Sequence, residues 1–208
     1  NVYFDDNPII QSAYESACQL GKRLNLNLFS NKINFENKEA TTSIKVKYLD
    51  SFEESSYQIT ITSDAIEILA GDETGLFYGL ISLMQLAQTY NQLVPCGTIV
   101  DKPRFSWRGQ HLDTVRHFYS VESILKLLDL MSLFKLNKFH WHGTDDEAFR
   151  FKLDDDYDIA TSTSVRGEGQ LVPPVFGSGP NPSGSSYDLA EIKRIIDRAS
   201  NNYIEVMP

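Results

Sequence analysis

The chain has 208 residues, of which 41% are hydrophobic and 23% are charged, as expected for a globular protein with a substantial core. Its formal net charge of −9 argues against nucleic acid as a partner, because it has no excess of basic groups to neutralise phosphates. No apolar run approaches the length of a membrane span. The first residue is Asn1 and no leader-like sequence follows, so we expect either a removed leader or a start inside a longer protein.

The first hundred residues predict a small domain of helices and strands. Apolar side chains recur at helical spacing over residues 7–28 and again over 73–88. Three strands with alternating apolar and polar residues are expected between these helices, at 44–48, 57–62 and 65–69. This order is typical of a compact α+β unit. The two cysteines, Cys18 and Cys96, can form one disulfide, but two buried thiols are the preferred interpretation.

The segment DKPRFSWRG at residues 101–109 changes the pattern. Pro103 interrupts regular structure, and Asp101 and Lys102 are typical of a linker. We therefore expect one domain over residues 1–102 and a second over 103–208.

Strands and helices alternate in the second domain. Short strands are expected at 109–114, 137–142 and 203–207. Ser120 and Asp188 are the expected N-caps of two helices, and the Gly-, Pro- and Ser-rich segment 177–186 is expected to be irregular. Such alternation predicts a parallel sheet with right-handed crossovers. Because a closed barrel needs eight strands, we expect the first three strand–helix steps of a TIM (β/α)8 barrel.

Polar residues follow the first two of these strands, in DTVRHF at 113–118 and HGTDDE at 142–147. Functional groups gather at the carboxyl ends of parallel strands, and consecutive strands are usually neighbours. Arg116 can bind paired acceptors such as vicinal hydroxyls or a carboxylate. A structural ion pair with Asp113 or Asp145 is an equal alternative.

Four further side chains are candidates in the second segment or just before it. Asp145 and Asp146 can supply a base, a metal ligand or an orienting group for a histidine. Without further context, a helix cap with a solvated neighbour is the preferred interpretation, because Asp-Asp is common in loops. His140 and His142 should share one face of their strand, opposite Trp141. An H-x-H pair can bind zinc, but packing or hydrogen bonding within the strand is the preferred interpretation.

Several motifs occur in order along this domain: WRG at 107–109, LDTVRHF at 112–118, KLNKFHWH at 135–142 and TDD at 144–146. Together they resemble the start of the catalytic domain of the family 20 glycoside hydrolases, the β-N-acetylhexosaminidases. VPPVFGSGP, YDLAEIKRIIDRA and IEVMP further along also resemble that family. The first hundred residues are more weakly similar to the α+β domain that precedes the barrel in these enzymes.

This resemblance implies a glycan that ends in N-acetylhexosamine as substrate, and neither a cofactor nor a metal. It implies that Arg116 grips ring hydroxyls of the terminal sugar and that Asp145 orients a histidine supporting the catalytic acid. Asp146 and His142 are further possible members of the site. In the family mechanism the 2-acetamido oxygen of the sugar attacks the anomeric carbon, while an Asp–Glu pair orients that group and protonates the leaving oxygen.

That histidine, the Asp–Glu pair and the enclosing tryptophans of the family match no position in the 208 residues. We therefore expect the chain alone to be inactive and to need further barrel strands from a longer parent or a second chain. Gly143 departs from the family, where a larger apolar residue is common. Two other functions stay open: a metal-dependent amidohydrolase using His140 and His142, and a non-catalytic sugar-binding or interaction module. Family habit favours a secreted or periplasmic location.

Overall fold

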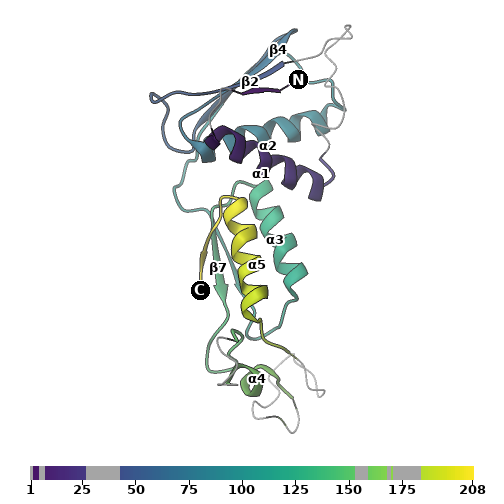
Figure 1. The fold of residues 1–208 in the computed structure, drawn as a ribbon, viewed down its shortest axis with the longest axis vertical. Helices are drawn as coiled ribbons and strands as arrows, with labels where there is room; N and C mark the ends of the chain where they lie inside the picture. Colours follow the sequence, from purple (N-terminus) through teal and green to yellow (C-terminus); the bar gives the residue numbers. More distant parts are fainter. Residues whose placement is uncertain (1, 5–7, 27–42, 153–158, 168–169, 171–183) are drawn as a thin grey trace. The chain divides into compact units, whose positions relative to one another are not determined.

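The computed structural model describes residues 2–4, 8–26, 43–152, 159–167, 170 and 184–208 (Figure 1). The chain divides into two compact units, Asn1–Ser106 and Trp107–Pro208, each with its own sheet. The division at residue 106 lies close to the boundary that the sequence predicts after residue 102. Within the described part, no helix is long and apolar enough to cross a membrane.

The first unit contains a five-stranded mixed sheet with strand order β1-β2-β4-β3-β5. The strands are β1 (Val2–Phe4), β2 (Ser43–Tyr48), β3 (Tyr57–Ile61), β4 (Ala65–Ala70) and β5 (Gly97–Asp101). β1, β2 and β4 run parallel, whereas β3 is antiparallel to both of its neighbours. The three strands expected from alternation, now β2, β3 and β4, are confirmed.

Two helices, α1 (Pro8–Arg23) and α2 (Glu73–Thr89), cover one face of this sheet (Figure 1). Alternate residues of β4 point toward them, so Ile66 and Ile68 are fully buried. Asp72 caps α2 by accepting a hydrogen bond from the backbone N–H of Gly75 at 2.7 Å. The predicted α+β character of this unit is confirmed.

Three expectations for the first unit need correction. β1 and β5 were not expected, and Asp101 is not part of a linker: it ends β5 and accepts a hydrogen bond from the Tyr57 hydroxyl at 2.7 Å. β5 is an edge strand with mostly exposed side chains, so it lacks the apolar alternation that marks a strand in sequence. The thiols of Cys18 and Cys96 are both free, and only Cys18 is partly buried. Cys96 is exposed because it lies in the bend before β5.

The second unit alternates strands and helices, as predicted. Its elements are β6 (Gly109–Asp113), α3 (Val121–Leu133), β7 (Lys138–His142), α4 (Ile159–Ser164), α5 (Leu189–Asn201) and β8 (Glu205–Met207). β6, β7 and β8 form a parallel sheet in that order. α3 and α5 lie side by side on one face of it (Figure 1). The short α4 was not expected, because its sequence IATSTS is rich in residues that disfavour helices.

The core of the second unit lies between this sheet and the two long helices. Phe139 and Trp141 project from β7 into it and meet Leu128 of α3 and Ile195 of α5, all essentially buried. The predicted caps are confirmed: Ser120 caps α3, and Asp188 forms a capping box with Glu191 at the start of α5.

Two loop and strand predictions have different outcomes. β8 is shorter than the expected strand over 203–207, because Tyr203 adopts a positive φ of 56° in the turn after α5. Of the predicted irregular segment 177–186, residues 177–183 lie outside the described residues, and 184–186 belong to no regular element.

Candidate active site

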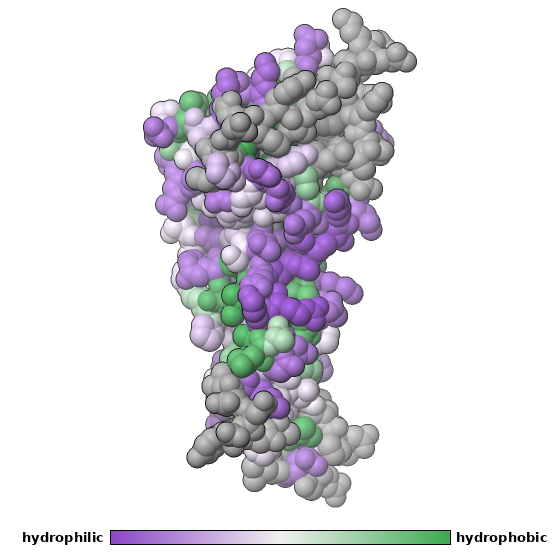
Figure 2. Space-filling model, viewed as in Figure 1, coloured by the Kyte–Doolittle hydropathy of each residue, from purple (hydrophilic) through white to green (hydrophobic). Residues whose placement is uncertain are grey.

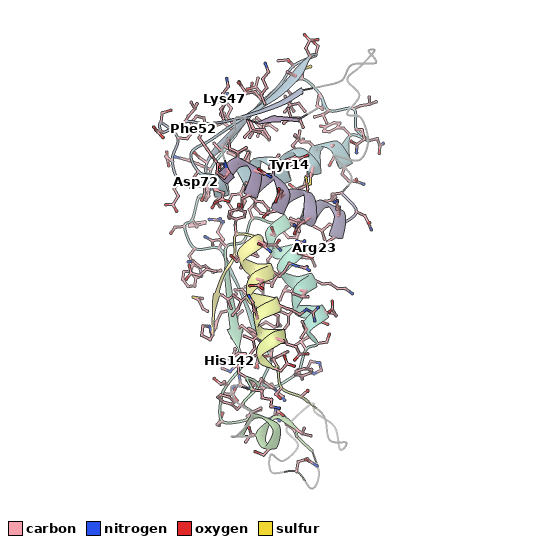
Figure 3. The ribbon with its side chains drawn as sticks, viewed as in Figure 1. Tyr14, Arg23, Lys47, Phe52, Asp72 and His142 are labelled. Atoms are coloured by element: carbon pink, nitrogen blue, oxygen red, sulfur yellow. The ribbon has the colours of Figure 1, made fainter. Side chains whose placement is uncertain are left out.

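The carboxyl ends of β6 and β7 lie next to each other. β6 ends at Asp113 and β7 at His142, and these two residues are register partners in the parallel sheet. The Thr114 N–H and hydroxyl both donate to the His142 carbonyl, each at 2.9 Å, which continues the pairing past the strand ends. The two polar segments expected to be neighbours are therefore brought together. His142 marks this end of the sheet in Figure 3.

Arg116 lies at the centre of the site and is surrounded by carboxylates. Its Nη1 donates to Asp113 Oδ2 at 2.9 Å, its Nη2 lies 3.2 Å from Asp145 Oδ2, and its Nε lies 3.7 Å from Glu147 Oε1. The Arg116 side chain is nevertheless 51% exposed. A guanidinium carries five N–H donors, so these contacts leave donors for hydroxyl groups of a ligand. The ion pairs with Asp113 and Asp145 that a structural role requires are present, and they still leave donors of Arg116 for a ligand.

Asp145 is fixed from several directions. Its Oδ2 lies 2.9 Å from His142 Nε2, and its Oδ1 accepts the backbone N–H of Glu147 at 2.7 Å. Burial alone would raise the pKa of Asp145, but the hydrogen bond with His142, the Glu147 N–H and the charge of Arg116 together lower it. Asp145 is therefore held as a carboxylate between an arginine and a histidine. The histidine that it contacts among the described residues is His142; the contact with a histidine further along the chain stays a prediction.

Asp113 is a second fixed carboxylate. One of its oxygens accepts the backbone N–H groups of Val115 and Arg116, at 2.9 and 3.0 Å, and the other accepts the Arg116 guanidinium. Burial would raise its pKa, but these hydrogen bonds and the charge of Arg116 lower it. Asp113 thus folds the chain back after β6 and directs Arg116 across the strand ends.

His140 and His142 share one face of β7, as predicted, while Phe139 and Trp141 are buried on the other. His111 of β6 joins them: its Nδ1 lies 3.0 Å from His140 Nδ1. Within the described residues, no group of three or more His, Cys, Asp or Glu side chains is placed to hold a metal ion.

Asp146 differs from its neighbour Asp145 in its surroundings. It is exposed, and among the described residues no hydrogen bond or ion pair to it is found. This position fits the alternative interpretation of Asp146 as a solvated neighbour of Asp145.

Three charged residues near the site were not predicted: Glu147, Arg150 and Arg166. Arg150 and Arg166 are each only 1% exposed, and both donate hydrogen bonds to the backbone that carries Arg116. Glu147 forms an ion pair with Arg166. The only signal in the sequence is the presence of charged residues within a long loop, and that does not distinguish a buried charge from a solvated one.

Comparison with known proteins identifies the family. The sequence profile "Glycosyl hydrolase family 20, catalytic domain" matches residues 105–208, and "Glycosyl hydrolase family 20, domain 2" matches residues 6–102. The chain belongs to glycosyl hydrolase family 20. The resemblance carried by the WRG, LDTVRHF and TDD motifs is therefore confirmed.

Relatives in this family are longer than the chain. It is 32% identical over 173 residues to a β-hexosaminidase of Vibrio vulnificus, covering 80% of the chain and 20% of that protein. It is 35% identical over 161 residues to the N,N'-diacetylchitobiase of Vibrio harveyi, covering 74% of the chain and 18% of that protein. A GH20 exo-β-N-acetylglucosaminidase from Vibrio harveyi, solved in complex with N-acetylglucosamine, superposes with a TM-score of 0.83 at 27% identity. That match covers all of the chain and 32% of the solved one, so the chain spans about a fifth to a third of these relatives.

Proposed function

We propose that the chain forms the N-terminal portion of an exo-β-N-acetylhexosaminidase, which removes terminal N-acetylhexosamine residues from glycans. One observation carries the proposal: Arg116 Nη2 and Asp145 Oδ2, from the loops after two adjacent parallel strands, lie 3.2 Å apart at the carboxyl end of the sheet. Membership of family 20 and the hexosaminidase activities of its relatives support this substrate class.

The proposed division into two domains also rests on the comparison with family 20. Residues 1–102 form the domain that precedes the barrel, and residues 103–208 form its first three strand–helix steps. Three parallel strands in chain order, with two long helices on one face, support this assignment. The remaining strands come from a longer parent or a second chain.

Arg116 binds the sugar in this proposal. Its guanidinium is planar and charged, and its fork of donors matches two neighbouring hydroxyl oxygens. The three carboxylates around it hold the fork in place before the sugar arrives, which lowers the entropic cost of binding. The sugar hydroxyls then take the exposed donors.

Asp145 acts as an orienting carboxylate. Its depressed pKa keeps it charged near neutral pH, and a charged carboxylate fixes the tautomer and the ring orientation of a histidine beside it. His142 is such a histidine in this chain, and the resemblance implies a second one further along. The backbone N–H of Glu147 donates to the Asp145 carboxylate and helps to hold it in place.

The bond is broken by substrate-assisted catalysis with retention of configuration. The acetamido oxygen of the sugar attacks the anomeric carbon, the glycosidic bond breaks, and an acid protonates the leaving oxygen. The Asp–Glu pair that the family uses for these steps matches no residue of this chain. Residues 103–208 therefore supply sugar binding and support for the site, and the acid comes from the remainder of the barrel. By family habit the enzyme is secreted or periplasmic.

The proposal is tested with the full-length protein that contains these residues. A chromogenic aryl N-acetyl-β-glucosaminide and its galacto-configured counterpart should both be assayed, and release of the aryl group from at least one is expected. Absence of turnover together with measurable binding of N-acetylglucosamine would instead support the sugar-binding module. Absence of both would reject the assignment.

A further inference from the structure

Two buried arginines enclose the main chain at Thr114–Arg116. Arg150 and Arg166 come from different loops, and each is 1% exposed. A buried guanidinium must find acceptors for its donors or pay a large desolvation penalty. Both side chains satisfy part of this requirement with backbone carbonyls of the segment that follows β6.

Arg150 holds the first half of this segment. Its Nε donates to the Thr114 carbonyl at 3.0 Å and its Nη2 to the Val115 carbonyl at 2.6 Å. Its Nη1 donates to the carbonyls of Ser164 and Ser185, the latter at 3.0 Å. Four carbonyls from three separate stretches of chain thus converge on one cation, so Arg150 ties the Arg116 segment to the loops beside it.

Arg166 holds the second half and also reaches the Arg116 side chain. Its Nη1 lies 3.5 Å from the Val115 carbonyl and 3.4 Å from the Arg116 carbonyl. Its Nη2 pairs with Glu147 Oε2, whose companion oxygen lies 3.7 Å from Arg116 Nε. One Glu147 carboxylate therefore bridges a buried arginine and the exposed arginine of the site.

This arrangement limits how Arg116 can move. The directions of the Thr114, Val115 and Arg116 carbonyls fix the peptide planes on both sides of Arg116, and hence the direction in which its side chain leaves the backbone. A shift of the segment would withdraw acceptors from two buried cations at once. The segment is therefore restrained although the Arg116 side chain is exposed.

We infer that Arg150 and Arg166 are positioning residues that set the location of the Arg116 guanidinium, with Glu147 as the link between the two side chains. The inference rests on the proposed function, because it assumes that Arg116 binds the sugar. Misplacement of a binding group by about 1 Å can reduce the rate about a hundredfold, so the effect should be kinetic as well as structural.

A double-mutant cycle in the full-length enzyme tests the coupling. Arg166→Gln should lower kcat/KM on the aryl N-acetyl-β-glucosaminide by roughly tenfold to a hundredfold. The same change in an Arg116→Ala background should cost less than about threefold, because there is then no guanidinium to position. Equal losses in the two backgrounds would overturn the inference.

Glu147→Gln is the second variant, since it breaks only the carboxylate link and leaves the two buried arginines in place. Its loss of kcat/KM should likewise be large when Arg116 is present and small in the Arg116→Ala background. An equal loss in both backgrounds would count against the link. The matched control is Arg198→Gln, which removes another partly buried arginine of the same unit, paired with Asp129 at 2.8 Å. We expect that control to lower the melting temperature but to leave kcat/KM within about twofold of wild type.

An NMR measurement separates failure of this inference from failure of the proposed function. The Arg116 Nε–H resonance, assigned by its loss in Arg116→Ala, reports the position of the side chain without any substrate. It should shift or broaden in Arg166→Gln and in Glu147→Gln, but not in Arg198→Gln. An unchanged resonance would overturn the positioning role even in an active enzyme, and a changed resonance would support it even if no glycoside is cleaved.

Discussion

At the scale of single residues, the site is a small charge network in which positive and negative groups alternate. Arg116 faces Asp113, Asp145 and Glu147, and Glu147 faces Arg166. The Arg116 side chain is 51% exposed, and ion pairs of exposed groups contribute little to stability, so its three carboxylate contacts are better explained by the need to hold this guanidinium in a fixed place.

The first prediction concerns Arg116. Arg116→Ala in the full-length enzyme should lower kcat/KM about a hundredfold to ten-thousandfold, because two charge-assisted hydrogen bonds to the sugar are lost. Arg116→Lys should recover little, since an ammonium retains the charge but not the planar fork. Steady-state kinetics on the aryl glycoside measure both. A loss of less than about threefold would leave Arg116 with a structural role only.

The second prediction concerns Asp145 and pH. The folded-state pKa of Asp145 is lowered, so its contribution to stability is fully present above the unfolded pKa of about 3.9 and is lost as the pH falls through the lower folded value. Asp145→Asn removes this titration. Urea unfolding midpoints between pH 6 and pH 2 should therefore decline less steeply for the variant than for wild type. Exposed Asp146, with Asp146→Asn, is the matched control, and parallel curves for Asp145→Asn and wild type would contradict the prediction.

At the scale of elements, the loop after β7 is a tight antiparallel turn that presents Asp145 and Glu147. The Arg150 N–H donates to the Gly143 carbonyl at 2.9 Å, and the Asp145 N–H donates to the Ala148 carbonyl at 3.1 Å. Gly143 lies where the turn passes the ring of Phe151. A Cβ on Gly143 would approach Phe151 Cζ to 2.1 Å, so the turn has no room for a larger residue at that position while Phe151 keeps its place.

The third prediction follows from this contact. Gly143→Ala should lower the free energy of unfolding by about 1–3 kcal/mol, because the added methyl group forces the Phe151 ring out of its packing against Trp141. Adding Phe151→Leu to Gly143→Ala should recover part of the loss. Gly97→Ala is the control, since a Cβ there meets no atom within 4 Å, and its effect should stay within about 0.5 kcal/mol. Equal effects of the two glycine substitutions in urea unfolding would contradict the explanation.

At the scale of the whole molecule, the second unit presents apolar surface beside its sheet. A groove of about 450 Å³ runs between α5 and β8, and its apolar lining comes from Trp141, Phe151, Ile192, Ile196, Ile204 and Val206. Figure 2 shows apolar residues at the surface of this unit on the face that it draws. In the proposed barrel, the next strand–helix step would cover such a groove, as each step does for the one before it.

The fourth prediction concerns the 208 residues taken alone. In the proposed assignment they contribute Arg116 and Asp145 but not the acid pair of the family, and general acid catalysis alone is worth about a hundredfold to ten-thousandfold. The purified, mass-verified chain should therefore not release the aryl group from a chromogenic N-acetylglucosaminide, whereas the full-length protein should. Turnover by the isolated chain at the rate of an ordinary glycosidase would show that the acid lies within these residues.

The sequence by itself determined the elements that carry a periodic or local signal. Alternation located β4 and β7 and correctly placed His140 and His142 on one face, and side-chain caps located the starts of α3 and α5. Ordered motifs identified the family and directed attention to Arg116 and Asp145. These features depend on neighbours within a few residues, so they can be read along the chain.

Only the tertiary structure decided the rest. β5 is an exposed edge strand that forms through pairing with β3, so its own residues carry no pattern. Arg150 and Arg166 have backbone carbonyls as partners, 35 and 50 residues away in the chain, and every residue has a carbonyl. No sequence signal can therefore reveal which carbonyls a buried arginine will meet, because the fold alone brings them together.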